Sequence, residues 1–440
     1  MAAGCAIGLG NIWRFPYIAG KYGGGLFVLL YFLCLLFFGV PVLLMELAIG
    51  RAGQSTYPGA FARLQNPQNK FKWKIPAYFL FSGNLILLMF YTVLTGWLLI
   101  YGCNFIAGNQ AVMEDVFFND MLAAPGKQII AMLASVLLTF LFCLGGVRRS
   151  VEKSVKIMMA GLFILLGVLV VQALSLPGAG KGLKFFLLPE FSGFTLDNIT
   201  ETLHAAMAQA FFTLSLGIGS IAVCGSYIGK ERSLFQEGFW IVLLDTAVAV
   251  SAGLVIFPSC MSFGIEPGEG PSLIFTTLPR VFQNMHFGFV WGFIFFAFLA
   301  VAALSTLVAV FENLVAFGID EFKWSRKKSC LIFSIAVAVL SIPCILGFNY
   351  WSAWHPLGGN SGILDLEDFI VSANLLPLGA LYLTVFCMSR YGWGTEKFFT
   401  ELNTGKGWKF PLWTRWYIRF VIPVFIALLW IIGIFSVFKK

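Results

Sequence analysis

Long runs of apolar residues follow one another along almost the whole chain, and they limit the possible folds more than any other feature. A helix needs about 20 apolar residues to cross the hydrocarbon of a bilayer. We therefore predict an all-α membrane protein with eleven transmembrane helices. The runs occupy residues 1–20, 25–50, 76–106, 128–145, 154–175, 200–228, 235–262, 288–318, 329–347, 366–389 and 417–438.

The composition points to lipid as the solvent of these runs. Of the 440 residues, 59% are hydrophobic and 11% are charged, whereas soluble domains contain roughly 25% charged residues. A globule of this size cannot bury so much apolar surface. The nine cysteines are scattered singly and form no CxxC pair, so neither a zinc site nor a disulfide framework is expected.

Basic residues lie mainly in alternate loops between the runs. With the N-terminus placed in the cytoplasm, the cytoplasmic loops contain about three times as many Lys and Arg residues as the outer loops. This bias predicts a multi-pass protein of the plasma (inner) membrane with a cytoplasmic N-terminus. The net charge of +8 forms no basic face and accompanies no aromatic RNA-binding motif, so no nucleic-acid partner is expected.

Glycine and hydroxyl residues interrupt two of the predicted helices. The first contains Gly4, Gly8 and Gly10, and the sixth contains the string SLGIGS at 215–220. One interpretation is close packing, since Gly4 and Gly8 form a GxxxG pair. The other is a pair of unwound segments, because the interruptions lie in the first members of two five-helix halves. Freed carbonyls could then coordinate a cation and freed amides an anion, as sodium and a zwitterionic amino acid require.

Several motifs resemble those of the neurotransmitter:sodium symporter family, in the family's order. GLGNIWRFPY at 8–17, MELAIGR at 45–51 and QAFFTLSLGIGS at 209–220 are similar to its first, second and sixth helices. The resemblance extends over nearly the whole chain and implies one transporter domain, 1–440. Within it the family pattern is a five-plus-five inverted repeat with helices 1 and 6 broken at mid-membrane. The expected parts are repeat one at about 1–175, repeat two at about 200–390 and an additional helix at about 417–438.

The resemblance implies a substrate site between the two breaks. The amides of Leu9 and Gly10, with the Tyr91 hydroxyl, would hold a carboxylate, although Tyr91 alone would suggest a packing tyrosine. The largely apolar lining favours an apolar or aromatic amino acid. The residues that match the family's substrate site are Ala6, Leu9, Gly10, Leu87, Tyr91, Phe212, Thr213, Ser215, Ile218, Thr306 and Val310.

Two sets of oxygen ligands match sodium sites of the family, and oxygen ligands suit a hard cation. The first set is the Ala6 carbonyl, Asn11, Thr213 and Asp245, with the substrate carboxylate. The second set is the carbonyls of Gly4, Ile7 and Ala302 with the hydroxyls of Ser305 and Thr306. Without the resemblance, these two hydroxyls would be interpreted as bonded to their own helix. Asp245 replaces the family's usual Asn, and its extra charge predicts transport without chloride.

Charged residues inside apolar runs are costly and indicate function. Arg14 and Asp368 resemble the family's outer gate pair, with Gln209 beside them and Phe212 as a lid. Tyr227 and Asp320 match the partners of an inner-gate arginine. Glu46 resembles a carboxylate that faces the sixth-helix break. Asp368 and Glu46 could instead be charges at the membrane surface.

Members of the family begin with a cytoplasmic tail and the inner half of helix 1. Here Met1 stands almost at the break, so we expect that tail and half-helix to be missing. Two functions remain open: sodium-coupled symport of an amino acid by alternating access, and ligand binding or sensing by a homologue that does not transport. A membrane enzyme is not expected, since the three histidines are isolated and no nucleophile motif is present.

Overall fold

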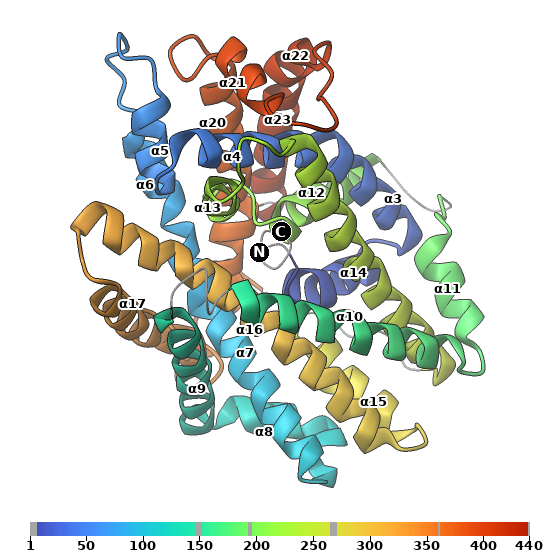
Figure 1. Ribbon diagram of the computed structural model, residues 1–440. Helices are drawn as coiled ribbons and strands as arrows, with labels where there is room; N and C mark the ends of the chain where they lie inside the picture. Colours follow the sequence, from blue (N-terminus) through green and yellow to red (C-terminus); the bar gives the residue numbers. More distant parts are fainter. Residues whose placement is uncertain (1–6, 146–151, 192–195, 265–270, 360, 439–440) are drawn as a thin grey trace.

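The computed structural model describes residues 7–145, 152–191, 196–264, 271–359 and 361–438. All named elements in these residues are helices, several of which continue directly into one another (Figure 1). Their bounds in chain order are η1 (Gly10–Arg14), α2 (Phe15–Lys21), α3 (Gly25–Cys34), η2 (Leu35–Gly39), α4 (Val40–Gly53), α5 (Tyr57–Leu64), α6 (Lys74–Phe81), α7 (Gly83–Ile106), η3 (Gln110–Met113), α8 (Asp115–Ala123), α9 (Pro125–Leu144), α10 (Glu152–Leu174), α11 (Ala179–Leu187), α12 (Leu196–Thr213), α13 (Ser220–Ser226), α14 (Leu234–Ser262), η5 (Leu273–Thr277), α15 (Leu278–Gln283), α16 (Gly288–Phe322), α17 (Arg326–Leu340), α18 (Ile342–Leu346), α19 (Ile363–Asp368), η6 (Phe369–Leu375), α20 (Leu376–Met388), α21 (Thr395–Leu402), α22 (Thr414–Trp416), η7 (Tyr417–Val421) and α23 (Ile422–Phe438).

Nine helical stretches of the described residues are long and apolar enough to cross a membrane. They correspond to nine of the eleven predicted runs. The two remaining runs, 1–20 and 200–228, are those that the glycines interrupt. Bulky apolar side chains such as Ile130 and Val171 are each 71% exposed, as lipid-facing side chains are.

Five wide π-type turns occur in the described residues, and each directly precedes a helix with proline at its second position. The turns are η1, η2, η5, η6 and η7. Proline has no N–H and its ring collides with the carbonyl four residues earlier, so the preceding turn widens. The prolines concerned are Pro16, Pro41, Pro279, Pro377 and Pro423.

The sixth predicted run is broken between α12 and α13. Ser215, Gly217 and Gly219 all have positive φ, at 52°, 87° and 87°, and no right-handed helix continues through such residues. Close packing contributes as well, because a Cβ on Gly217 would lie 2.5 Å from the Leu376 carbonyl oxygen. The unwound interpretation therefore holds for 214–219, and the glycines also allow a close approach to α20.

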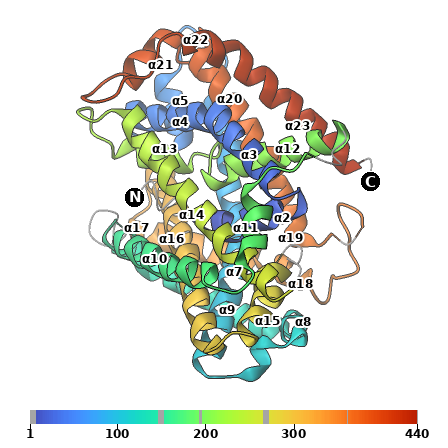
Figure 2. The same cartoon turned by 90° about the vertical axis from the view of Figure 1, so that its right-hand side faces the viewer.

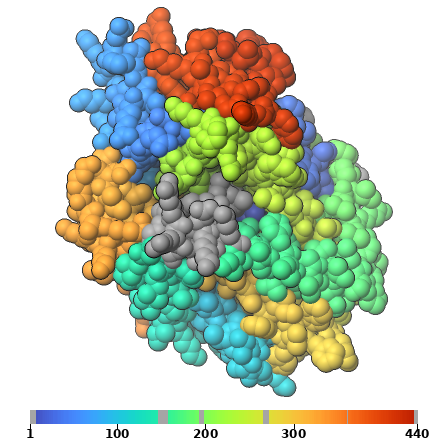
Figure 3. Space-filling model, in the orientation of Figure 1, coloured from blue at the N-terminus to red at the C-terminus, as the bar shows by residue number. Residues whose placement is uncertain are grey.

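The two ends of the bundle collect the segments that we predict on opposite sides of the membrane. In Figures 1 and 2, α5, α21 and α22 lie at one end, whereas α8 and α15 lie at the other. Figure 3 shows the C-terminal residues, in red, gathered at the end that carries α5. Arg51 forms an ion pair with Glu401 at 2.6 Å there, and the Asn66 side-chain amide donates to the Arg390 carbonyl oxygen.

Candidate functional site

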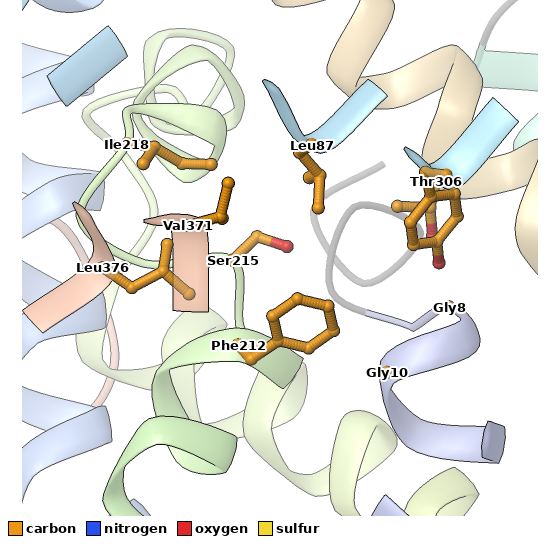
Figure 4. Close-up of a pocket in the computed structure, with 10 residues that line it drawn as sticks. Gly8, Gly10, Leu87, Phe212, Ser215, Ile218, Thr306, Val371 and Leu376 are labelled. Carbon is orange, nitrogen blue, oxygen red and sulfur yellow. The ribbon is translucent and has the colours of Figure 1, made fainter. Parts of the chain in front are cut away.

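A cavity lies where the start of the described chain meets the break after α12. It is lined by Gly8, Gly10, Leu87, Tyr91, Phe212, Ser215, Ile218, Thr306, Val371 and Leu376. Figure 4 shows Ile218, Val371 and Leu376 on one side, and Gly8, Gly10 and Thr306 on the other. The cavity thus has an apolar end and an end formed by exposed backbone and a hydroxyl.

Most of the predicted substrate residues line this cavity. Leu9, Thr213 and Val310 are buried but do not belong to its lining, and Ala6 lies outside the described residues. Sequence reasoning missed Val371 and Leu376, which belong to η6 and the start of α20. Pro377 was the available signal, because a proline inside an apolar run marks an irregular turn.

Tyr91 joins the first described residues to α7. Its hydroxyl accepts a hydrogen bond from the Leu9 amide at 2.6 Å and lies beside the Thr306 side chain. Tyr91 is 3% exposed, so this bond forms away from bulk water. Two of the three predicted carboxylate donors, the Leu9 amide and the Tyr91 hydroxyl, are therefore bonded to each other beside the cavity.

Asn11 and Asp245 form the centre of the first predicted ion site. The Asn11 side-chain amide donates to Oδ1 of Asp245 at 2.7 Å, and Oδ1 of Asn11 accepts the Gly8 amide at 3.1 Å. Asp245 is fully buried, and its Oδ2 has no hydrogen-bond partner in the described chain. The Thr213 hydroxyl lies nearby. A buried carboxylate oxygen without a donor favours a cation beside it, so this set fits sodium.

The second predicted ion site brings Ile7 against α16. The Thr306 hydroxyl lies 3.2 Å from the Ile7 carbonyl oxygen and 3.4 Å from that of Ala302. The Ser305 hydroxyl donates to the Ala302 carbonyl at 2.8 Å, which is the bonding to the own helix that the sequence alone suggested. Four of the five predicted ligands thus adjoin one another, while Gly4 lies outside the described residues.

Arg14 lies next to the cavity-lining residue Phe212 and bonds to α19. Its guanidinium donates to Gln209 Oε1 at 2.6 Å and to Asp368 Oδ2 at 3.3 Å, and it lies 4.6 Å from the centre of the Phe212 ring. Gln209 in turn donates to the Gly10 carbonyl at 2.8 Å. The predicted gate residues therefore form one connected network from η1 to α12 and α19.

The other two predicted gate residues are not bonded to each other in the part of the chain that the structure describes. Asp320, near the end of α16, accepts the Thr56 amide at 3.2 Å. Tyr227 follows α13 and is 50% exposed.

Glu46 lies beneath the break and is fully buried. Its two carboxylate oxygens accept the amides of Gly217 at 2.8 Å and Ile221 at 3.1 Å. A surface position for this charge is therefore excluded. Because the break frees these amides from helical bonds, the carboxylate gives them the acceptor that lipid and apolar side chains cannot supply.

Asn84 supports the far end of the break, and sequence reasoning missed it. Its amide donates to the Ile218 carbonyl at 2.7 Å, while its Oδ1 accepts Ser220 Oγ at 2.8 Å and Asn313 Nδ2 at 3.2 Å. These bonds fix Ile218 at the edge of the cavity. An amide side chain inside an apolar run was the signal that could have identified it.

Comparisons with known proteins agree over the whole chain. A model described as the sodium:neurotransmitter symporter family matches residues 1–114 and 104–440. A sodium-dependent transporter of Bacillus subtilis, YhdH, is 33% identical over 99% of this chain and 96% of its own length. One from Haemophilus influenzae is 32% identical over 98% and 95%. The crystal structure of MhsT in complex with L-phenylalanine superimposes with a TM-score of 0.87 at 34% identity, covering 98% of this chain and 97% of that one.

Proposed function

The chain belongs to the sodium:neurotransmitter symporter family, and from that membership we propose that it moves an amino acid together with sodium across the plasma membrane. The family consists of sodium-dependent transporters, so this multi-pass membrane protein is not an enzyme. The observation that carries the amino-acid proposal is the cavity of Figure 4, which has a backbone end and an apolar end. An amino acid has the same division between its charged groups and its side chain.

The substrate in this proposal is an apolar or aromatic amino acid. Its carboxylate would lie at the Leu9 and Gly10 amides and the Tyr91 hydroxyl, and its side chain would extend toward Ile218 and Val371. The bound L-phenylalanine of the MhsT structure supports this choice. Backbone carbonyls around the break would accept the ammonium group.

One or two sodium ions would bind beside the substrate. The first ion would use Asn11, Thr213 and Asp245. The second ion would use the carbonyls of Gly4, Ile7 and Ala302 and the hydroxyls of Ser305 and Thr306. Support comes from the unpartnered oxygen of Asp245 and from the carbonyl of Ile7 held against Thr306. A bound sodium ion would neutralise the buried charge of Asp245 and hold the start of the chain against α14 and α16.

Alternating access would follow from two broken helices in an inverted repeat. We propose eleven transmembrane helices, namely the nine long ones and the two interrupted runs, with the N-terminus in the cytoplasm. The Arg14–Asp368 contact then closes the outer side, and Tyr227 and Asp320 lie toward the inner side. Opening one side while the other stays closed would let the ion-loaded site exchange with each face of the membrane.

Transport without chloride is a separate part of this proposal. Asp245 supplies a negative charge next to the first ion site, so a chloride ion is not needed to balance sodium. Uptake should continue when gluconate replaces chloride. Loss of uptake in gluconate would contradict chloride-independent transport.

The decisive experiment is binding of a panel of labelled L-amino acids to the purified protein with sodium or with potassium, followed by uptake into proteoliposomes. Sodium-dependent binding and uptake of an apolar or aromatic amino acid are expected. Binding without uptake would favour the second function, a homologue that only binds or senses its ligand. Absence of binding for every amino acid tested would contradict both the transport function and the binding function.

A further inference from the structure

Glu367 differs from the other deeply buried acidic side chains among the described residues. Glu46 accepts two backbone amides, Asp245 accepts an asparagine amide, and Glu312 forms an ion pair with an arginine. Glu367 is only 4% exposed, yet neither of its carboxylate oxygens accepts a hydrogen bond from an N–H or a hydroxyl group of the described chain. It lies on α19, directly before the gate residue Asp368.

The elements packed against α19 offer Glu367 no cation. The main ones are α7, α18 and η6. Arg14 of η1 and Lys21 of α2 also approach α19, but they act on Asp368 and Asp365 respectively. The Cys344 thiol of α18 lies beside the carboxyl group, and η6 contains no titratable residue. The titratable groups of these elements and of α19 itself are Tyr91, Tyr101, Cys103, Cys344, Asp365 and Asp368.

The charged groups nearest along the chain already have partners. Asp365 accepts the Gly362 amide at 2.7 Å. Asp368 accepts from Ser372 at 2.5 Å and from Arg14, which also binds Gln209. Glu367 is therefore buried beside one thiol, and Arg14 is bonded to other residues.

An ionised carboxylate in such a place costs several kcal/mol, because it loses its water and gains no cation and no N–H or hydroxyl donor. The neutral acid avoids this cost. We propose that Glu367 is a proton-binding site: it carries a proton while the outer gate is closed, and it must take one up for Arg14 and Asp368 to meet. This inference rests on the proposed function, since it assigns an opening and closing motion to that gate.

The proton follows the motion of α19. When the gate opens, water reaches Glu367 and the carboxylic acid releases its proton to the outer solution. When the gate closes, the carboxylate takes a proton from the same solution and becomes buried. The proton enters and leaves on one side, so it regulates closure and is not itself transported. Alkaline outer solution should therefore hold the gate open and weaken retention of substrate.

Infrared difference spectroscopy detects this proton without any transport measurement. The wild-type protein with sodium and amino acid should show a protonated-carboxyl band that Glu367→Gln lacks. Gln has the shape of the neutral acid, so the variant should fold. Asp365→Asn changes an exposed carboxylate of the same helix and should keep the band. Identical carboxyl bands in wild type and Glu367→Gln would overturn the inference.

A pH series of sodium-dependent amino-acid binding supplies the second test. The affinity of the wild type should fall as pH rises, by up to about tenfold per pH unit, because one proton must bind before closure. Glu367→Gln should keep its high affinity throughout, and Asp365→Asn should follow the wild type. If the affinity of Glu367→Gln fell with pH as steeply as that of the wild type, the inference about Glu367 would be overturned and the proposed function would stand. If no amino acid bound at any pH, the proposed function would fail instead, and the infrared result would still decide the protonation of Glu367.

Discussion

At the scale of single residues, the candidate site depends on buried polar groups, and they differ in how completely the chain satisfies them. Asp245 is the clearest case, because Asn11 satisfies one of its oxygens and the other has no donor among the described residues. Glu46 shows the opposite arrangement, in which both oxygens are satisfied by backbone amides. The unsatisfied oxygen of Asp245 suits a site that receives an ion. The fully satisfied carboxylate of Glu46 suits a structural role, in which it holds the backbone of the break.

Asp245→Asn should weaken sodium binding without unfolding the protein. The substitution removes the charge that favours the cation but keeps the size of the side chain. We expect the sodium concentration for half-maximal amino-acid binding to rise about tenfold or more, which corresponds to about 1.4 kcal/mol. Asp120→Asn, at an exposed position of α8, is the control and should leave the sodium titration unchanged. An unaltered sodium curve for Asp245→Asn would argue against the first ion site.

Glu46→Gln should destabilise the fold. One carboxylate oxygen would become an NH₂ group facing an amide of Gly217 or Ile221, which leaves a buried donor unsatisfied at a cost of about 1–3 kcal/mol. The unfolding temperature in detergent should fall for Glu46→Gln and stay constant for Glu114→Gln, which lies on the surface. Equal unfolding temperatures would show that the break does not depend on this carboxylate.

At the scale of elements, the break between α12 and α13 depends on residues that accept positive φ. Gly217→Ala should disturb the break in two ways. Its φ of 87° is unfavourable for alanine, and the new Cβ would collide with the Leu376 carbonyl oxygen. We expect a lower unfolding temperature and loss of amino-acid binding. Gly102→Ala is the matched control, since its Cβ would meet no atom within 4 Å and alanine favours helix. Normal binding by Gly217→Ala would show that the strained geometry is unnecessary.

The sequence predicted the helices well and the irregular turns poorly. Nine apolar runs reappear as long helices, because hydropathy and length suffice for a membrane span. Glycines in SLGIGS located the sixth-helix break, since few other residues tolerate its backbone. Val371 and Leu376 were missed because their place in the cavity depends on how η6 turns and where α20 packs. Those features depend on tertiary contacts that no single run of residues contains.

At the scale of the whole molecule, the predicted orientation can be tested with the natural cysteines. Of the described cysteines, Cys103 is exposed and the others are buried. It lies near the end of α7 that we place outside. A membrane-impermeant maleimide added to intact cells should therefore label the wild type and not Cys103→Ser. Labelling that required permeabilised cells would reverse the orientation.

Gly217 and Gly379 bring two main chains together where the break after α12 crosses α20. A Cβ on Gly379 would stand 2.1 Å from the Gly217 carbonyl oxygen, so the backbones touch with no side chain between them. Side chains between two elements can usually change rotamer when the elements shift, and they absorb part of the shift in this way. Because no side chain separates the two backbones, a displacement of α20 should move the backbone of the break with it. The same helical stretch carries Asp368 at its other end, so the proposed outer gate and the break after α12 are both attached to the stretch from α19 to α20.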